Sequence, residues 1–249
     1  MKNALKLIGI IAIAAVIGFC LVSCGDDGAG GNSGGNNSGN TGGNGGGNGG
    51  GNAGNNITSG AEVVYDSSIK DLTEAKGKTD FGYTYYYDEE ENNEEIKPLS
   101  EFLDGSPSVK ISGGKVTINF GTPKSDYLST FNNWLTEYGL TVSPSNAKFF
   151  VFNNLVTADG KYFLGCIKDD NNLSILFYAD KDATISGTAS DIDGGKVWTS
   201  TFNVSLKKGW NYLIMSDNEE TSTATYTSSV TQPSGFKWTV WTVLDDRRN

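Results

Sequence analysis

Histidine is absent from this chain of 249 residues, and cysteine occurs only three times. Without an imidazole, the chain cannot build a Ser-His-Asp or Cys-His nucleophile, a histidine-ligated zinc centre or a histidine general base. Glycine is abundant, yet no glycine-rich phosphate loop follows a strand and opens a helix. These absences favour a protein that is not an enzyme and that carries no dissociable cofactor.

Positive charge is also scarce, since 19 Lys and Arg stand against 29 Asp and Glu, which gives a formal net charge of -10. A chain with this balance repels the phosphates of nucleic acids and the headgroups of an anionic bilayer. We therefore expect no nucleic-acid partner, and no attachment of the folded part to a membrane through a basic patch.

The N-terminus carries the clearest targeting pattern. Lys2 and Lys6 precede an apolar run from Leu7 to Val22. As a helix this run would cover about 24 Å, which is short of the roughly 30 Å hydrocarbon core of a bilayer. A positive start and a short apolar run are typical of a secretory signal peptide, with an uncleaved anchor as the alternative.

The end of the apolar run, Leu21-Val22-Ser23-Cys24, resembles the lipobox of bacterial lipoproteins. The resemblance implies that residues 1–23 are removed as a signal peptide and that the Cys24 thiol carries a diacylglycerol lipid. The mature chain would then be held at the bilayer of the bacterial cell envelope, with a net charge of -12. The inner membrane, the outer membrane and the cell surface all stay open as locations.

The segment that follows predicts a tether. Residues 25–56 contain 16 Gly and 9 Asn among 32 positions and show no apolar periodicity. Glycine loses the most backbone entropy on ordering, so we expect residues 24–57 to be a lipidated, disordered leash. A random coil of this length spans roughly 30 Å, enough to hold a domain clear of the headgroups.

Beyond the tether we expect a transitional, partly ordered segment at 58–105 and a folded domain at 106–249. Apolar runs such as KVTINF, KYFLGCIK and KVWTSTFNVSL alternate with Gly-, Asn- and Asp-rich turns every 8–12 residues. This pattern predicts a mainly β fold, an antiparallel β-sandwich. VSLKKGWNYLIMS, with Trp210 after a tight turn, resembles the strand edges of immunoglobulin-like and transthyretin-like sandwiches.

One amphipathic helix is predicted at about 125–138, where Tyr127, Leu128, Phe131, Trp134, Leu135 and Tyr138 fall at helical spacing. The later stretch KFFVFNNLV is apolar on both faces of a strand. Such a strand needs a cover on each side, so we expect the helix to pack on the outer face of its sheet.

Few residues qualify as site residues apart from the lipidated Cys24. Trp241 shares its side of a strand with Lys237 and Thr239, which makes it the best candidate for an exposed ring that stacks on a sugar; core packing is the alternative. Asp191 and Asp193 resemble the start of a calcium loop. The later ligands of such a loop are missing, which favours a hairpin turn.

Two further groups receive structural interpretations. Cys166 lies in an apolar, strand-like run and reads as a small buried hydrophobe. The acids from Asp88 to Glu95 read as a solvated loop.

The expected function is that of an exported, membrane-anchored lipoprotein that acts as a surface or periplasmic binding or adhesion module for a protein, a glycan or a matrix component. One alternative is a structural envelope component that assembles with other membrane proteins. The other is a hydrolase that uses two carboxylates, for which the sequence nominates no pair.

Overall fold

The structure is a computed structural model that describes residues 56–67, 69–88, 93–130, 135, 138–152, 155–169, 171–193 and 196–242. The predicted signal peptide, Cys24 and nearly all of the predicted tether lie outside the described residues. Within the described residues, no helix is long and apolar enough to cross a bilayer.

The described chain is mainly β, which confirms the expected fold class at that level. Its strands are β1 (Asn56–Tyr65), β2 (Tyr83–Asp88), β3 (Asn93–Pro98), β4 (Ser108–Ser112), β5 (Lys115–Asn119), β6 (Leu140–Ser143), β7 (Phe149–Val151), β8 (Leu155–Val156), β9 (Tyr162–Asp169), β10 (Asn172–Ala179), β11 (Ala183–Asp193), β12 (Lys196–Leu206), β13 (Gly209–Asn218), β14 (Thr223–Ser229) and β15 (Lys237–Thr242). The short helical elements are α2 (Leu72–Gly77), α3 (Leu99–Phe102) and the 3₁₀ turn η1 (Ser125–Tyr127).

Local sequence explains many of these elements. The β4–β5 hairpin alternates buried and exposed residues, and it turns at Gly113 and Gly114, which have φ angles of 57° and 71°. Glycine takes such angles without the clash that a Cβ causes. The helix α2 begins after Asp71, whose carboxylate accepts a hydrogen bond from the Glu74 backbone N–H at 2.8 Å. That bond satisfies one of the free N–H groups of the first turn.

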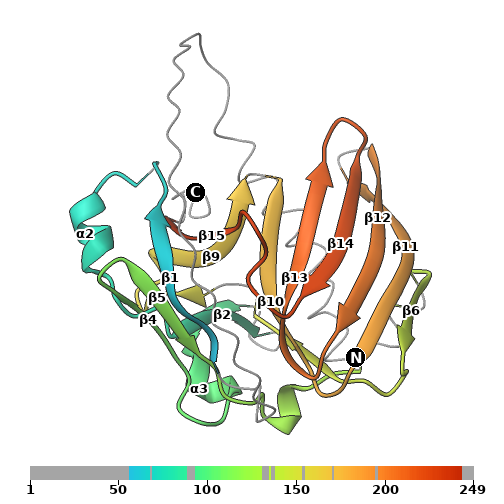
Figure 1. The fold of residues 1–249 in the computed structure, drawn as a ribbon, viewed down its shortest axis with the longest axis horizontal. Helices are drawn as coiled ribbons and strands as arrows, with labels where there is room; N and C mark the ends of the chain where they lie inside the picture. The colour runs from blue at the N-terminus through green and yellow to red at the C-terminus, as the bar shows by residue number, and fades with distance from the viewer. Residues whose placement is uncertain are drawn as a thin grey trace, which may run out of the picture.

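The strands form one large mixed sheet in the order β4-β5-β1-β15-β9-β10-β13-β14-β12-β11-β6, with β2, β3, β7 and β8 attached off this path. Figure 1 shows β4 and β5 on one side of the molecule and β11 and β6 on the other. The pairs β1–β15 and β12–β14 are parallel. A continuous mixed sheet differs from two stacked antiparallel sheets, so the finer expectation of an immunoglobulin-like or transthyretin-like sandwich is not confirmed.

The sheet encloses two hydrophobic cores, and β10 and β13 contribute to both. On β10, Leu176 and Tyr178 pack into the first core, whereas Ile175 and Phe177 pack into the second. On β13, Trp210 and Tyr212 belong to the first core, and Leu213 and Met215 to the second. Alternate residues of a strand point to opposite faces, so the two cores lie on opposite faces of these strands.

The first core combines residues from the segment 58–105 with residues from 106–249. Phe81, Leu99 and Phe102 of the earlier segment are buried together with side chains of β5, β9 and β15. The parallel pairing of β1 with β15 also joins this segment to the last described strand. The earlier segment is therefore part of the same packed unit in the described structure.

The predicted helix at 125–138 is wrong at its start. Ser125–Tyr127 form a single 3₁₀ turn, and Leu128 already has extended backbone angles. Ser129 then forms a β-bridge with Phe149, in which each backbone N–H donates to the other residue's carbonyl. Pairing with a strand withdraws these backbone groups from a helix. Residues 131–134 and 136–137 lie outside the described residues.

The helical spacing of apolar residues has another explanation in the structure. Tyr127 and Leu128 pack against the first core, whereas Leu135 and Tyr138 belong with the second. A straight helix presents one apolar stripe to one core. Leu135 is itself helical, so the correction concerns the residues from Leu128 to Thr130, which are not helical in the structure.

The stretch KFFVFNNLV does have a cover on each face, but the source of the cover differs from the expectation. Phe149 is buried in the second core and Val151 packs against it, while Phe152 is buried in the first core and Phe150 packs against that one. The two-sided apolar pattern therefore marks a strand, β7, at the boundary between two cores.

Candidate functional site

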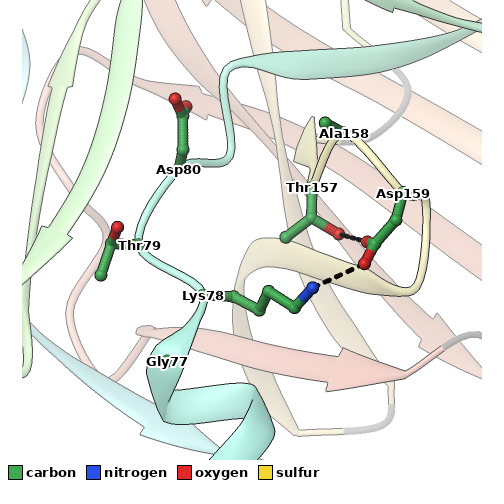
Figure 2. A pocket seen from close by; sticks show the side chains of 7 residues that line it. All are labelled: Gly77, Lys78, Thr79, Asp80, Thr157, Ala158 and Asp159. Carbon is green, nitrogen blue, oxygen red and sulfur yellow. Dashed lines mark hydrogen bonds and ion pairs between the residues drawn. The ribbon is translucent and has the colours of Figure 1, made fainter.

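A shallow pocket of about 270 Å³ opens between the end of α2 and the turn that connects β8 to β9. Its lining residues, shown in Figure 2, are Gly77, Lys78, Thr79, Asp80, Thr157, Ala158 and Asp159. Lys78 follows the helix directly and reaches across to the turn, where Thr157 and Asp159 lie. The pocket therefore brings together two segments that are about eighty residues apart in the chain.

The charges of this pocket are paired with each other. The Lys78 ammonium donates to Asp159 at 2.6 Å, the Thr157 hydroxyl donates to the other Asp159 oxygen at 2.6 Å, and the Lys161 backbone N–H adds a bond of 3.2 Å. Burial alone would raise the pKa of Asp159, but these bonds outweigh burial and lower the pKa to about 2. The hydrogen bond to Asp159 raises the pKa of Lys78 in return.

Sequence reasoning overlooked that Gly77-Lys78-Thr79 is the Gly-Lys-Thr triplet with which phosphate-binding loops end. Such a loop needs a glycine five residues before the second one, and Leu72 stands there. The triplet also begins at the last residue of a helix, Gly77 of α2, whereas in a phosphate loop it opens a helix. With Asp80 and Asp159 in the lining, an anionic ligand would meet two carboxylates, so the pocket does not have the chemistry of a phosphate site.

Carboxylate catalysis receives no support from the same pocket. Asp159 stays ionised far below neutral pH, so it cannot donate a proton to a leaving group. Asp80 accepts hydrogen bonds from the Gly82 backbone N–H at 2.9 Å and from Lys110. The arrangement joins α2 to the β8–β9 turn.

A second acid with a shifted pKa lies elsewhere, on β13. Burial and the neighbouring charge of Glu219 raise the pKa of Asp217 to about 6. Asp217 pairs with Ala224 of β14, at the end of the strands that enclose the second core. Asp159 is bonded to the residue after α2, beside the first core, so the two acids belong to different parts of the fold.

Trp241, the ring predicted from sequence to be exposed, is half-buried on β15 and forms part of a row of three aromatic side chains. Its indole lies parallel to the Phe163 ring of β9, with centroids 5.8 Å apart and planes 8° apart. Phe163 in turn stacks on Tyr85 of β2 at 5.6 Å and 29°. We call Tyr85, Phe163 and Trp241 the aromatic row.

The register between the strands determines on which face of the sheet the aromatic row lies. Trp241 is directly opposite Phe163 in the β15–β9 ladder. The neighbouring residues Trp238, Val240 and Leu164 point into the first core, so Phe163 and Trp241 point to the other face of the sheet. None of the three row residues belongs to either hydrophobic core, and all three are half-exposed.

Two glycines give the row its space. A Cβ at Gly165 would stand only 2.6 Å from the tip of the Trp241 indole, and one at Gly160 would stand 2.7 Å from the Tyr85 hydroxyl. The Tyr85 hydroxyl donates to the Gly160 carbonyl at 2.9 Å, which fixes that ring at one end of the row. Any larger residue at either glycine would displace a ring, so these positions shape the row.

The sequence identified one ring of the three. Phe163 and Tyr85 were missed because their contact depends on register between strands that are far apart in the chain. The alternation of Tyr83, Tyr85 and Tyr87 is the one pattern that points to a ring-bearing face on β2.

The other residues that were predicted as possible site residues belong to a strand or to a hydrophobic core. Asp191 and Asp193 are within β11 and pair with Trp198 and Lys196 of β12, so both are part of the β11–β12 strand pair. The described residues contain no cluster of three or more metal-ligating side chains. Cys166 is a free, buried thiol whose pKa burial raises to about 12, as expected for a core residue.

Comparison of the chain with protein-family models, with curated protein sequences and with solved structures finds no match.

Proposed function

We propose that this protein is an exported, lipid-anchored binding module that recognises neutral glycans through the aromatic row. The observation that carries the proposal is the row itself: three rings in contact, each partly exposed and none of them part of either hydrophobic core. Aromatic side chains usually contribute their area to a core or to an interface. Rings kept together outside the cores are therefore candidates for an interface.

Sugars suit such rings for a physical reason. One face of a pyranose carries C–H groups with slight positive charge, and the face of an aromatic ring is negative. Stacking the two removes apolar area from water while the sugar hydroxyls remain hydrated at the edges. A structural role also exists, because Trp241 covers Gly165, and the experiment below separates the two roles.

The anchor part of the proposal comes from the lipobox resemblance at Cys24 and from the tether composition. A leash of roughly 30 Å lets a domain reach a polymer in front of the membrane. We expect Cys24→Ala to abolish labelling by a fatty-acid analogue and to leave an unprocessed precursor in cells. Acyl labelling that persists in Cys24→Ala would contradict the lipid assignment.

The glycan part is tested with the chain from residue 24 to 249 that carries Cys24→Ser, so that it is soluble. The chain is incubated with a panel of insoluble neutral polysaccharides, and the bound fraction is measured. We expect at least one polysaccharide to retain the chain and Trp241→Ala to lose most of the retention. Trp198→Ala is the matched control, because Trp198 is also half-exposed but lies on β12. Retention that is equal in Trp241→Ala and the unaltered chain would overturn the proposal.

The alternative of an envelope assembly component has one supporting observation. β6 ends the sheet path, and its four residues, Leu140–Ser143, carry no charge that would keep another strand away. The strand is short, which itself limits pairing with a partner. Chemical cross-linking in intact cells distinguishes this role, because an assembly component gives a defined cross-linked species without added glycan.

A further inference from the structure

We infer that the protein has a second binding surface, a sheet face covered with hydroxyl groups that adsorbs to ice. This surface goes beyond the proposed function, because its strands supply none of the three rings of the aromatic row. Figure 1 shows these strands, β11, β12 and β14, side by side next to β13. We define the hydroxyl face by six residues on the three strands: Thr188, Ser190, Thr199, Thr201, Thr223 and Thr225.

The register of the strands arranges the hydroxyl face as a regular array. Residues directly opposite each other in the ladders form two rows across the strands, Thr188–Thr201–Thr225 and Ser190–Thr199–Thr223. The pairs in both ladders are consecutive, so the rows keep the ordinary dimensions of a sheet. Neighbouring hydroxyl-bearing residues are therefore about 4.8 Å apart across the strands and about 6.7 Å apart along a strand.

The hydroxyl face points away from the second core and toward solvent. Ala189 and Ala224 alternate with its residues along β11 and β14, and both are buried in the second core. Alternate residues of a strand point to opposite faces, so the hydroxyl face is the outer side of these strands. Thr199 and Thr223 are half-exposed, and the other four residues are exposed. The array is therefore accessible to a ligand.

The hydroxyl face carries no charge, which restricts the class of ligand. About 25–35% of the surface residues of a small soluble domain are ordinarily charged, whereas these six residues are all Thr or Ser. Asp182, before β11, and Lys207, after β12, are charged but pair with each other at 2.8 Å. A charged partner would select complementary charges, and an apolar partner would select larger apolar side chains. The composition of the face fits a neutral ligand rich in hydroxyl groups or water.

Among neutral ligands, ice suits the hydroxyl face better than a dissolved sugar. A Thr hydroxyl that exchanges water for a sugar hydroxyl gains little, and the six residues offer no ring on which a sugar could stack. In ice the partner is water itself. Water oxygens on a prism face of hexagonal ice repeat in two perpendicular directions at spacings similar to those of the two rows. Water that is ordered on the hydroxyl groups can therefore continue into the lattice.

The side chains of the hydroxyl face are stiff enough to keep such an array. Thr is branched at Cβ, which restricts its first side-chain torsion. The hydroxyl oxygens of Thr221 and Thr223 are 2.7 Å apart, the usual distance of a hydrogen bond between hydroxyls, so the orientation of Thr223 is also fixed. Adjacent strands twist by about 20–25°, which confines the match with a flat lattice to these few strands. Thr is also favoured in strands by its intrinsic propensity, and the substitutions below separate the two explanations.

The test grows ice slowly from a dilute solution of the Cys24→Ser chain and measures protein by absorbance in the melted ice and in the remaining liquid. We expect the chain to be incorporated into the ice and Thr201→Tyr to stay in the liquid. Tyr also suits a strand, but its ring stands above the array and holds its neighbours away from the lattice. Thr117→Tyr is the matched control, because Thr117 is an exposed Thr in the middle of β5, and it should be incorporated like the unaltered chain.

The outcomes also separate this inference from the proposed function. The inference is overturned if the unaltered chain stays in the liquid, or if Thr201→Tyr enters the ice as well as the unaltered chain does. If Thr201→Tyr does not fold, Thr225→Tyr, in the same row, takes its place. Trp241→Ala should be incorporated normally, and its exclusion from ice would assign ice to the aromatic row instead. Glycan retention by Thr201→Tyr should equal that of the unaltered chain, so either proposal can fail alone.

Discussion

The molecule holds two groups of aromatic rings that differ in burial although they share the same sheet. In the first core, Trp210 stacks on Phe152 at 5.5 Å and 6°, and its indole N–H donates to the Gly121 carbonyl at 3.0 Å. In the aromatic row, Trp241 and Phe163 are equally parallel, but they are half-exposed. The comparison teaches that ring stacking alone does not identify a core, because burial is what distinguishes the two groups.

Strand β15 shows the same contrast within four residues. Trp238 is 1% exposed and belongs to the first core, whereas Trp241 points to the opposite face. The first ring therefore contributes mainly to stability, and the second is the one that the proposed function assigns to a ligand. We expect a substitution of Trp238 to change mainly the free energy of unfolding, and a substitution of Trp241 to change mainly binding.

The largest loss of stability is expected from Trp210→Ala. Removal of a buried Trp from a packed core costs about 3–5 kcal/mol, because contacts with Phe120, Phe152 and Tyr178 are replaced by a cavity. The free energy of unfolding is measured by urea titration. A loss below about 1 kcal/mol would show that this ring cluster does not organise the first core.

Asp217→Asn should raise stability at neutral pH. Burial first, and then the charge of Glu219, raise the pKa of Asp217 from 3.8 to about 6 in the folded chain. Below pH 3.8 the carboxyl is protonated in both states, and between 3.8 and about 6 only the folded state holds the proton. Stability should therefore fall as the pH rises through this window, and Asp217→Asn should remove that slope. An unchanged slope in the variant would contradict the assignment.

Asp159→Asn should have a smaller effect, of the opposite sign. The bonds from Lys78, Thr157 and Lys161 overcome the effect of burial and hold the pKa of Asp159 at about 2, below its usual 3.8. Its contribution is present above pH 3.8 and is lost as the pH falls through about 2. Because the pair is partly exposed, we expect a loss of about 1 kcal/mol or less at neutral pH. Urea titrations at acid and neutral pH check both the sign and the window.

The smallest change in stability is expected from Trp241→Phe. The ring stays stacked on Phe163, and cross-strand pairs of this kind contribute about 0.2–1 kcal/mol. Glycan binding should fall severalfold because the larger indole face is lost, yet it should exceed that of Trp241→Ala. Equal binding by Trp241→Phe and Trp241→Ala would show that the ring at this position does not contact the ligand.

Local patterns in the sequence were enough to predict the strands and several buried residues. Alternation of Val116 with Ile118 and the two faces of β12 correspond to buried and exposed sides, and Cys166 is in the core as expected. Such patterns report the environment of one strand at a time. They do not contain the pairing between distant strands, so the parallel pair β1–β15 could not be predicted.

The same limit explains the two misjudged features. The apolar spacing at 125–138 does not reveal that the helix cannot begin at Ser125, because the bridge between Ser129 and Phe149 depends on a distant strand; Leu135 is helical as predicted. Predicting the aromatic row requires the register between β2, β8, β9 and β15. The sequence alone indicated only one of its three rings, Trp241. The predicted lipobox is different, because the resemblance rests on four consecutive residues, Leu21 to Cys24, and it stays a prediction.

Indole N–H signals in a proton–nitrogen NMR spectrum test the account most directly, because one spectrum reports the buried and the exposed tryptophans together. On addition of a neutral polysaccharide that retains the chain, we expect the Trp241 signal to shift and the Trp210 and Trp238 signals to stay in place. A Trp241 signal that does not move while the polysaccharide is bound, or a shift at Trp198 in its place, would contradict the assignment of the aromatic row as the binding surface.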